Sequence, residues 1–419
     1  MTASGEARRG RGAVVLAAGA LALLTALPVA AGPDEDARRI YDRLAGVPPS
    51  DSDLADMAAD ISAGNPEDAA VVAMKDPAFY NVTLKNWAKP WTNRDQSVFV
   101  PLNDYVATVI GMIRDDVPIN QLLSADILYR GKSGLSGVPA PAADNNDHYE
   151  TLESGGFDLS DDTVLVRSTQ SGVYGIDPSA TAGVMTSRAA SRAFFKDGTN
   201  RAMFRFTVLN QLCYDLETLK DNTRPPDRVR QDVSRSPGGD SRIFLNNCAG
   251  CHTGMDPMAQ AFAYYDFEYP GDNPDAGELV WNAPGTVDPE TQADNGIDTR
   301  VQEKYLQNGT TFEAGYVTPD DHWDNYWREG PNKSIGWDFN DASPGGSGRG
   351  AKSLGRELAN TRAFAECQAK KVFRTVCLRP PSSNADRSWV SDEAVALRDN
   401  GYKMKPVFAA AAAYCLTGN

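Results

Sequence analysis

Residues 246–257 of this 419-residue chain read NNCAGCHTGMDP and contain one C-x-x-C-H pattern. The spacing places the Cys248 and Cys251 thiols about one turn apart on a short helix, where both can add to the vinyl groups of one haem. His252 follows directly, so its imidazole faces the iron from the same side. The pattern therefore predicts one covalent haem c, attached through Cys248 and Cys251, with His252 as the proximal iron ligand.

Two other uses of a C-x-x-C pair predict different surroundings. A structural zinc site needs two further cysteine or histidine ligands, but the other cysteines do not repeat the spacing and the chain has three histidines. A thioredoxin-type redox pair follows a strand in a βαβ unit, whereas helix and loop patterns surround this motif. Haem attachment is therefore the leading interpretation. After the motif, Asp256-Pro257 predicts the start of a new helix with Asp256 as its N-cap.

The motif does not decide which residue, if any, binds the other face of the iron. A low-spin electron carrier uses methionine or histidine there. Met404 precedes the last predicted helix, where single-haem cytochromes c place a loop methionine, so it is the first candidate. Met185 and Met203 are alternatives, although such methionines are more often core residues, and His148 and His322 lie in acidic loops where solvation is favoured over ligation. A vacant sixth site is the remaining alternative.

The first 31 residues have the composition of a secretory signal peptide. Three arginines precede an apolar run that begins at Ala13, Pro28 interrupts the run, and small residues end it at Ala31. We expect cleavage after Ala31; the alternative is an uncleaved anchor, because the run is nearly long enough to span a bilayer. After cleavage the protein should not span a membrane, and it should be periplasmic, extracellular or at the cell surface.

Cysteine usage agrees with an oxidising compartment. Haem attachment leaves four cysteines, an even number that predicts two disulfides. Cys367 and Cys377 belong to one predicted helix and would lie about 15 Å apart along its axis, whereas bridged Cα atoms lie within roughly 7 Å. That pair is excluded if the helix is continuous. We predict Cys213–Cys367 and Cys377–Cys415 instead.

Hydrophobic periodicity predicts a mainly α-helical protein. A helical N-terminal region would precede a cytochrome-c-like haem domain, which an insertion with some β-structure interrupts. The strand signals are a short run at 163–168 and a hairpin that turns at Asn308-Gly309. The predicted segments are the signal peptide (1–31), the N-terminal helical region (32–150), lead-in helices with the haem motif (151–265), the insertion (266–350) and C-terminal helices that complete the haem domain (351–419).

Several blocks resemble secreted planctomycete-type cytochrome c domain proteins, a family of unknown function with a single C-x-x-C-H haem motif. The blocks are RRIYDRLAGVPPSDSDLADM and DPAFY near the N-terminus, AGVMTSRAASRAFF and NRAMFRFTVLNQLC before the motif, CAGCHTGMDPMAQAFAYYDFE around it, and FAECQAKKVFRTVCLRPP and NGYKMKPVFAAAAAY near the C-terminus. The segment from about 270 to 350 does not match, and Met404 falls where an apolar residue is expected in the family. The resemblance implies one haem c and supplies no reaction.

These features favour an exported monohaem c-type cytochrome that transfers single electrons to and from a redox partner protein. A haem enzyme of the peroxidase or oxygenase type, with an open sixth site, is one alternative. A haem-bearing structural component of a surface assembly is another. The formal net charge of −15 disfavours nucleic acid as a partner.

Overall fold

The computed structural model describes residues 32–196, 198–273, 276–296, 298–306, 314–342 and 345–416. The predicted signal peptide and the predicted turn at Asn308-Gly309 lie outside these residues. Helix accounts for 55% of the structure and strand for 7%, so the predicted mainly helical class is confirmed. No helix among the described residues is both long enough and apolar enough to cross a membrane.

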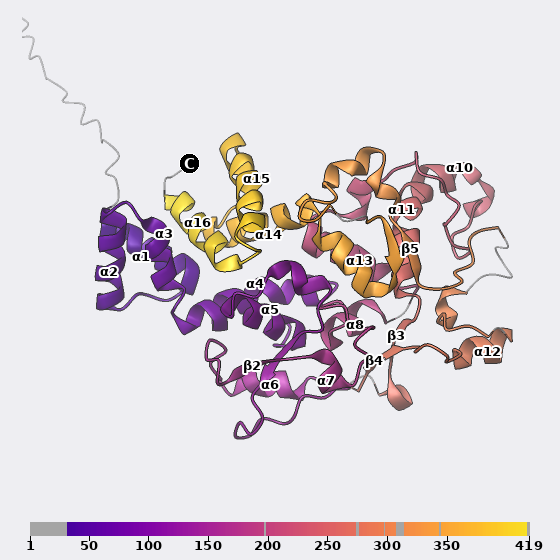
Figure 1. The fold of residues 1–419 in the computed structure, drawn as a ribbon, viewed down its shortest axis with the longest axis horizontal. Coiled ribbons are helices and arrows are strands. Elements are labelled where there is room, and N and C mark those ends of the chain that lie inside the picture. Colours follow the sequence, from indigo (N-terminus) through magenta and orange to yellow (C-terminus); the bar gives the residue numbers. More distant parts are fainter. Residues whose placement is uncertain are drawn as a thin grey trace, which may run out of the picture.

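Helices dominate the described residues, and the few short strands form three antiparallel pairs (Figure 1). The α-helices are α1 (Pro33–Ala45), α2 (Asp51–Ser62), α3 (Pro66–Ala73), α4 (Lys85–Ala88), α5 (Asp104–Arg114), α6 (Asp147–Ser154), α7 (Gln170–Tyr174), α8 (Arg188–Phe194), α9 (Arg201–Thr207), α10 (Ser241–Ile243), α11 (Ala249–Ala259), α12 (Pro289–Asn295), α13 (Gly350–Ala359), α14 (Arg362–Cys377), α15 (Asn384–Asp399) and α16 (Met404–Leu416). The strands are β1 (Leu128–Gly131), β2 (Leu165–Ser168), β3 (Tyr265–Glu268), β4 (Glu278–Trp281), β5 (His322–Asp324) and β6 (Ser347–Arg349).

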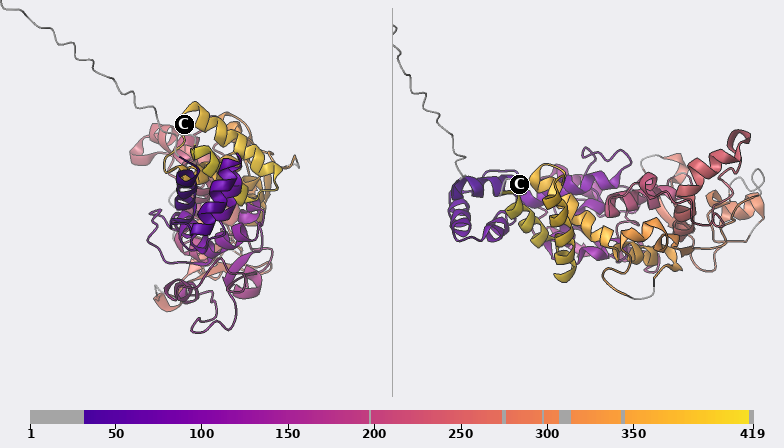
Figure 2. Two further views of the ribbon diagram at one scale, coloured as in Figure 1. Left: turned by 90° about the vertical axis from the view of Figure 1, so that its left-hand side faces the viewer. Right: turned by 90° about the horizontal axis from the view of Figure 1, so that it is seen from above.

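The described part of the chain is elongated, and its two ends meet (Figures 1 and 2). The C-terminal helix α16 packs against α1, α3 and α14 at one end of the molecule. Helices α4, α5 and α8 lie in the middle, and α11, α13 and the β5–β6 pair lie toward the other end. The C-x-x-C-H motif and the C-terminal helix are therefore at opposite parts of the fold.

Helix α5 lies in the middle of the molecule and contacts α4, α8 and β1. Asn103 caps its first turn, because the Asn103 side chain accepts a hydrogen bond from the Val106 amide. The buried Asp104 carboxylate accepts hydrogen bonds from the Arg188 and Ala189 amides, which joins α5 to the start of α8. The strand predicted at 163–168 is confirmed as β2, which pairs antiparallel with β1 beside α5.

The predicted C-terminal helices are confirmed and include α14, α15 and α16. Helix α15 begins at Asn384 because Ser383 and Asp386 form a capping box, and α16 begins at Met404. Helix α14 is continuous through Cys377, so the exclusion of a Cys367–Cys377 bridge holds.

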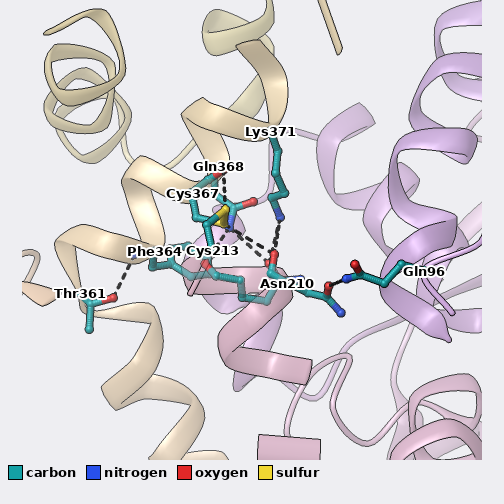
Figure 3. The surroundings of a disulfide bond; sticks show 9 residues. Gln96, Asn210, Cys213, Thr361, Phe364, Cys367, Gln368 and Lys371 are labelled. Atoms are coloured by element: carbon teal, nitrogen blue, oxygen red, sulfur yellow. Dashed lines mark hydrogen bonds between the residues drawn. A yellow bond between two sulfur atoms is a disulfide. The ribbon is translucent and has the colours of Figure 1, made fainter. Parts of the chain in front are cut away.

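Both predicted disulfides are confirmed. The Cα atoms of Cys213 and Cys367 are 5.3 Å apart, and those of Cys377 and Cys415 are 5.4 Å apart. The first bridge joins the end of η4 (Val208–Leu212) to α14 (Figure 3). The second bridge joins α14 to α16. Two disulfides are compatible with an exported protein.

A buried carboxyl makes the stability of the C-terminal helices depend on pH. Burial, together with the negative charge of Glu67, raises the pKa of Glu393 in α15 to about 7. Between the ordinary pKa of glutamate and pH 7 the native state therefore binds more protons than the unfolded chain, and stability falls as pH rises.

Replacing Glu393 by glutamine removes this loss. The variant should be more stable than the parent by up to about 3 kcal/mol at pH 8, and nearly equal to it at pH 4. Urea unfolding at both pH values measures the difference. If the variant and the parent differ in stability by the same amount at pH 4 and pH 8, the raised pKa of Glu393 is contradicted.

Candidate functional site

The C-x-x-C-H motif lies on one continuous helical segment. The π-helical turn η7 (Phe244–Cys248) runs directly into α11, so Cys251 and His252 occupy the first turn of α11 (Figure 1). Cys248 and Cys251 are half-buried and free, whereas the other four cysteines form the two disulfides. The two thiols left over by the disulfides are thus the pair that haem attachment requires.

A pocket of about 510 Å³, here called the motif pocket, opens beside this turn. Cys251 and His252 both line it, whereas Cys248 packs beside Phe244 on the preceding turn. Helix α9 and the 3-10 turn η5 (Leu216–Leu219) form other walls of the motif pocket. Its remaining lining residues are Arg94, Arg201, Ala202, Arg205, Phe206, Asp215, Leu216, Glu217 and Met255.

These lining residues fit a haem. The volume lies within the range of cofactor sites, and such sites combine apolar walls with a few placed polar groups. Phe206 and Leu216 provide apolar wall, Arg94 is a cation that suits a carboxylate side group, and Arg205 pairs with the lining residue Asp215 at 3.0 Å. Cys251 supplies a thiol and His252 supplies an imidazole from the same helix turn.

The His252 ring is held by a buried carboxylate. Its Nδ1 atom lies 3.1 Å from Oδ1 and 3.2 Å from Oδ2 of Asp256, one helical turn further along α11. Asp256 also accepts two hydrogen bonds from Arg201, at 2.6 and 2.9 Å, and one from the Arg230 amide at 3.2 Å. Arg201 in turn pairs with Asp232. His252, Asp256, Arg201 and Asp232 are called the Asp256 network below.

The Asp256 network keeps its central carboxylate charged. The Asp256 side chain is fully buried, which opposes ionisation, but the Arg201 charge and the hydrogen bond to His252 hold the pKa of this carboxyl well below its usual range. Because Asp256 occupies Nδ1, Nε2 is the His252 nitrogen that remains for a metal ion. A carboxylate behind a ligating histidine fixes the orientation of the ring and raises its basicity.

The predicted role of Asp256 as an N-cap is wrong. Helix α11 runs through Asp256 and keeps Pro257 in its interior, so no helix starts there. The Asp256 carboxylate instead bonds side chains and a backbone amide from other parts of the site. Sequence reasoning also missed Arg201. The signal that was available is the four-residue spacing from His252 to Asp256, which places both side chains on one face of a helix.

Close packing fixes α11 against the rest of the fold. Gly254 faces the buried Trp327 ring, and a Cβ atom at Gly254 would lie 1.9 Å from the Trp327 Nε1 atom. Only glycine allows this approach between the helix and the indole. The turn that carries His252 is therefore positioned by packing as well as by the Asp256 network.

The predicted sixth ligands do not line the motif pocket. Met404 begins α16 and is 1% exposed, and α16 packs against α1, α3 and α14, away from α11 (Figure 1). Met185 and Met203 are buried together around a small internal cavity. The structure therefore does not bring these three methionines to His252.

The two other histidines have different surroundings. His148 was expected to be solvated, but it is 2% exposed: its Nδ1 lies 2.6 Å from the Pro139 carbonyl oxygen, and its Nε2 accepts the Gly131 amide at 2.8 Å. His322 begins β5, is partly exposed, and lies 3.4 Å from Asp324. Among the described residues that line the motif pocket, no histidine or methionine comes from an element other than α11.

The rival interpretations of the C-x-x-C pair find less support in the surroundings. Helix α10 and η7 precede the motif, where a thioredoxin-type pair would have a strand. Within the described ranges, no three histidine, cysteine, aspartate or glutamate side chains are grouped so that they could hold a metal ion.

Comparison of the chain with family models, with curated proteins and with solved structures found no match.

Proposed function

We propose that the chain is an exported monohaem c-type cytochrome that transfers single electrons. The haem would be attached to Cys248 and Cys251, and His252 would be its proximal ligand through Nε2. The observation that carries the proposal is that Cys251 and His252 of one C-x-x-C-H motif line the same pocket while Asp256 occupies His252 Nδ1. When bound, the haem supplies a one-electron couple between ferric and ferrous iron, and a redox partner protein gives or takes that electron.

Covalent attachment is tested by mass and by spectrum. After expression with a cytochrome c maturation system, the denatured chain should retain one haem, and a Cys248→Ser/Cys251→Ser variant should lose it. Cys377→Ser/Cys415→Ser is the matched control, because it removes two cysteines far from the motif and should keep the haem. Haem that washes out of the denatured parent chain would overturn the proposal.

A second candidate function follows from the pocket lining. Among the described residues, the motif pocket offers no histidine or methionine opposite His252, which favours a haem enzyme or ligand-binding haem protein with an open sixth site. A histidine that bonds a carboxylate is also the more basic kind of proximal ligand. This candidate expects a high-spin spectrum and rapid binding of carbon monoxide.

The two candidates are separated by spectra of the parent chain and of Met404→Ala. Because Met404 is buried between α16 and its neighbours, Met404→Ala should leave the visible spectrum and carbon monoxide binding unchanged. A low-spin parent that gains an open site on this replacement would restore Met404 as the sixth ligand and favour the electron carrier.

A further inference from the structure

We propose that a second pocket, separate from the haem motif, binds a small organic oxyanion, either a carboxylate or a phosphate ester. This pocket, called the arginine pocket here, has a volume of about 520 Å³ and lies between α8 and the segment that precedes α5. Its lining includes four cationic side chains, from Arg94, Arg188, Arg192 and Lys196. The chain as a whole carries a formal charge of −15, so a cluster of four cationic side chains differs in sign from the charge of the whole protein.

Three of the cations follow the helical repeat. Arg188, Arg192 and Lys196 are spaced four residues apart, and α8 with the turn after it brings all three to the arginine pocket. Like charges at this spacing repel one another and destabilise a helix. A bound anion would reduce this repulsion, so anion binding would explain why cationic side chains recur at this spacing.

Arg188 is the most specific part of the site. It lines the arginine pocket although the residue is only 6% exposed. Its Nη2 atom donates to the Asp144 carbonyl at 2.8 Å, but its Nε atom is buried without a hydrogen-bond partner. An unpaired donor in a buried guanidinium costs free energy, and this guanidinium belongs to a residue that lines the pocket.

Carboxylates near these cations also accept other donors. Asp104 and Asp144 attract Arg188, and the oxygens of Asp104 accept backbone amides of Tyr105, Arg188 and Ala189. Glu150 lines the pocket and accepts a hydrogen bond from Asn146 at 3.0 Å. Cations therefore outnumber carboxylates among the residues that line the pocket.

The opposite wall is held in place by hydrogen bonds to α8. Arg94 Nε donates to the Ala193 carbonyl at 2.6 Å, and its Nη2 donates to the Lys196 carbonyl at 3.1 Å. Lys196 Nζ lies 4.9 Å from the centroid of the Tyr269 ring, which also lines the arginine pocket. These contacts preorganise the charged walls, and planar guanidinium groups match carboxylate and phosphate oxygens.

Arg94 lines the motif pocket as well as the arginine pocket. A ligand in the arginine pocket would thus lie next to the proposed haem site. The inference does not depend on the haem, because Cys248, Cys251 and His252 are not among the residues that line the arginine pocket.

Calorimetric titration of the full chain with citrate and with glucose 6-phosphate tests the proposal. At least one probe should bind saturably above a sodium chloride control of equal ionic strength, and the preferred probe identifies a carboxylate or a phosphate ligand. Arg192→Gln/Lys196→Gln should weaken that binding by about tenfold or more, because charge-assisted hydrogen bonds are lost. Both side chains are exposed, so the variant should fold.

Arg38→Gln is the matched control, because it removes an exposed charge on α1, away from the arginine pocket, and should leave binding unchanged. The absence of saturable binding of both probes to the parent chain would overturn the proposal. Equal binding by Arg192→Gln/Lys196→Gln and the parent would also overturn it. The Cys248→Ser/Cys251→Ser variant, which should lack haem, should still bind the oxyanion probe as the parent does. The test of the arginine pocket and the test of haem attachment can therefore fail separately.

Discussion

Replacing Cys213 and Cys367 by serine should lower the free energy of unfolding by about 5 kcal/mol. The bridge closes a segment with a sequence separation of 154 residues, so it removes much conformational freedom from the unfolded chain. The Cys377–Cys415 bridge spans only 38 residues, and its removal should cost about 4 kcal/mol. Urea unfolding of both double variants, without reductant so that the remaining disulfide stays formed, measures which variant loses more free energy of unfolding.

The surroundings of the Cys213–Cys367 bridge make the expected loss larger rather than smaller. Lys371 on α14 donates to the Asn210 carbonyl at 3.0 Å (Figure 3). The Lys371 ammonium also lies 3.5 Å from the centroid of the Trp91 ring. Asn210 also accepts a hydrogen bond from Gln96 at 2.8 Å. The bridge thus fixes η4 to α14 where a third segment joins them. A smaller loss for this variant than for the Cys377–Cys415 variant would contradict the loop-length argument.

The helices could be predicted from the sequence because their causes are local, whereas for the disulfides the helix pattern excluded one pairing and did not decide between the other two. Apolar residues recur at helical spacing between 102 and 113, where the buried helix α5 forms, and the continuous pattern around Cys367 and Cys377 excluded one pairing. The β5–β6 pair had no such signal, because its short strands lie far apart in the chain and contain few β-branched residues.

The candidate site was predictable only in part. The motif predicts Cys248, Cys251 and His252 as the haem-attachment residues because haem attachment dictates their spacing, and the structure places Cys251 and His252 beside one pocket. The arginine behind Asp256 comes from α9, about fifty residues earlier in the chain, and nothing local in the sequence relates the two. The position of Met404 before the last predicted helix suggested an iron ligand, but α16 packs against α1 and α3. This packing joins segments far apart in the chain, so the local sequence around Met404 does not reveal it.

The second large effect is expected at Asp256. Replacing it by asparagine leaves the shape of the side chain but removes the buried charge that pairs with Arg201 and accepts from His252. Breaking a buried pair on one side costs about 3–5 kcal/mol, and the lower value is expected here because Arg201 keeps Asp232. Asp240→Asn is the matched control: its pair with Arg242 is exposed, so stability should be unchanged within error.

Stability alone would not distinguish a positioning role for Asp256 from a purely structural one, so the reduction potential of the holoprotein is the second measurement. If the haem is bound as proposed, the anionic carboxylate behind His252 makes the imidazole a stronger donor and favours ferric iron. The neutral amide in Asp256→Asn should therefore raise the potential, whereas Asp240→Asn should not move it. A destabilised Asp256→Asn protein with the parent's potential would assign Asp256 to the fold alone. A raised potential together with the lost stability would show that one carboxylate both holds α9 against α11 and tunes the proximal ligand.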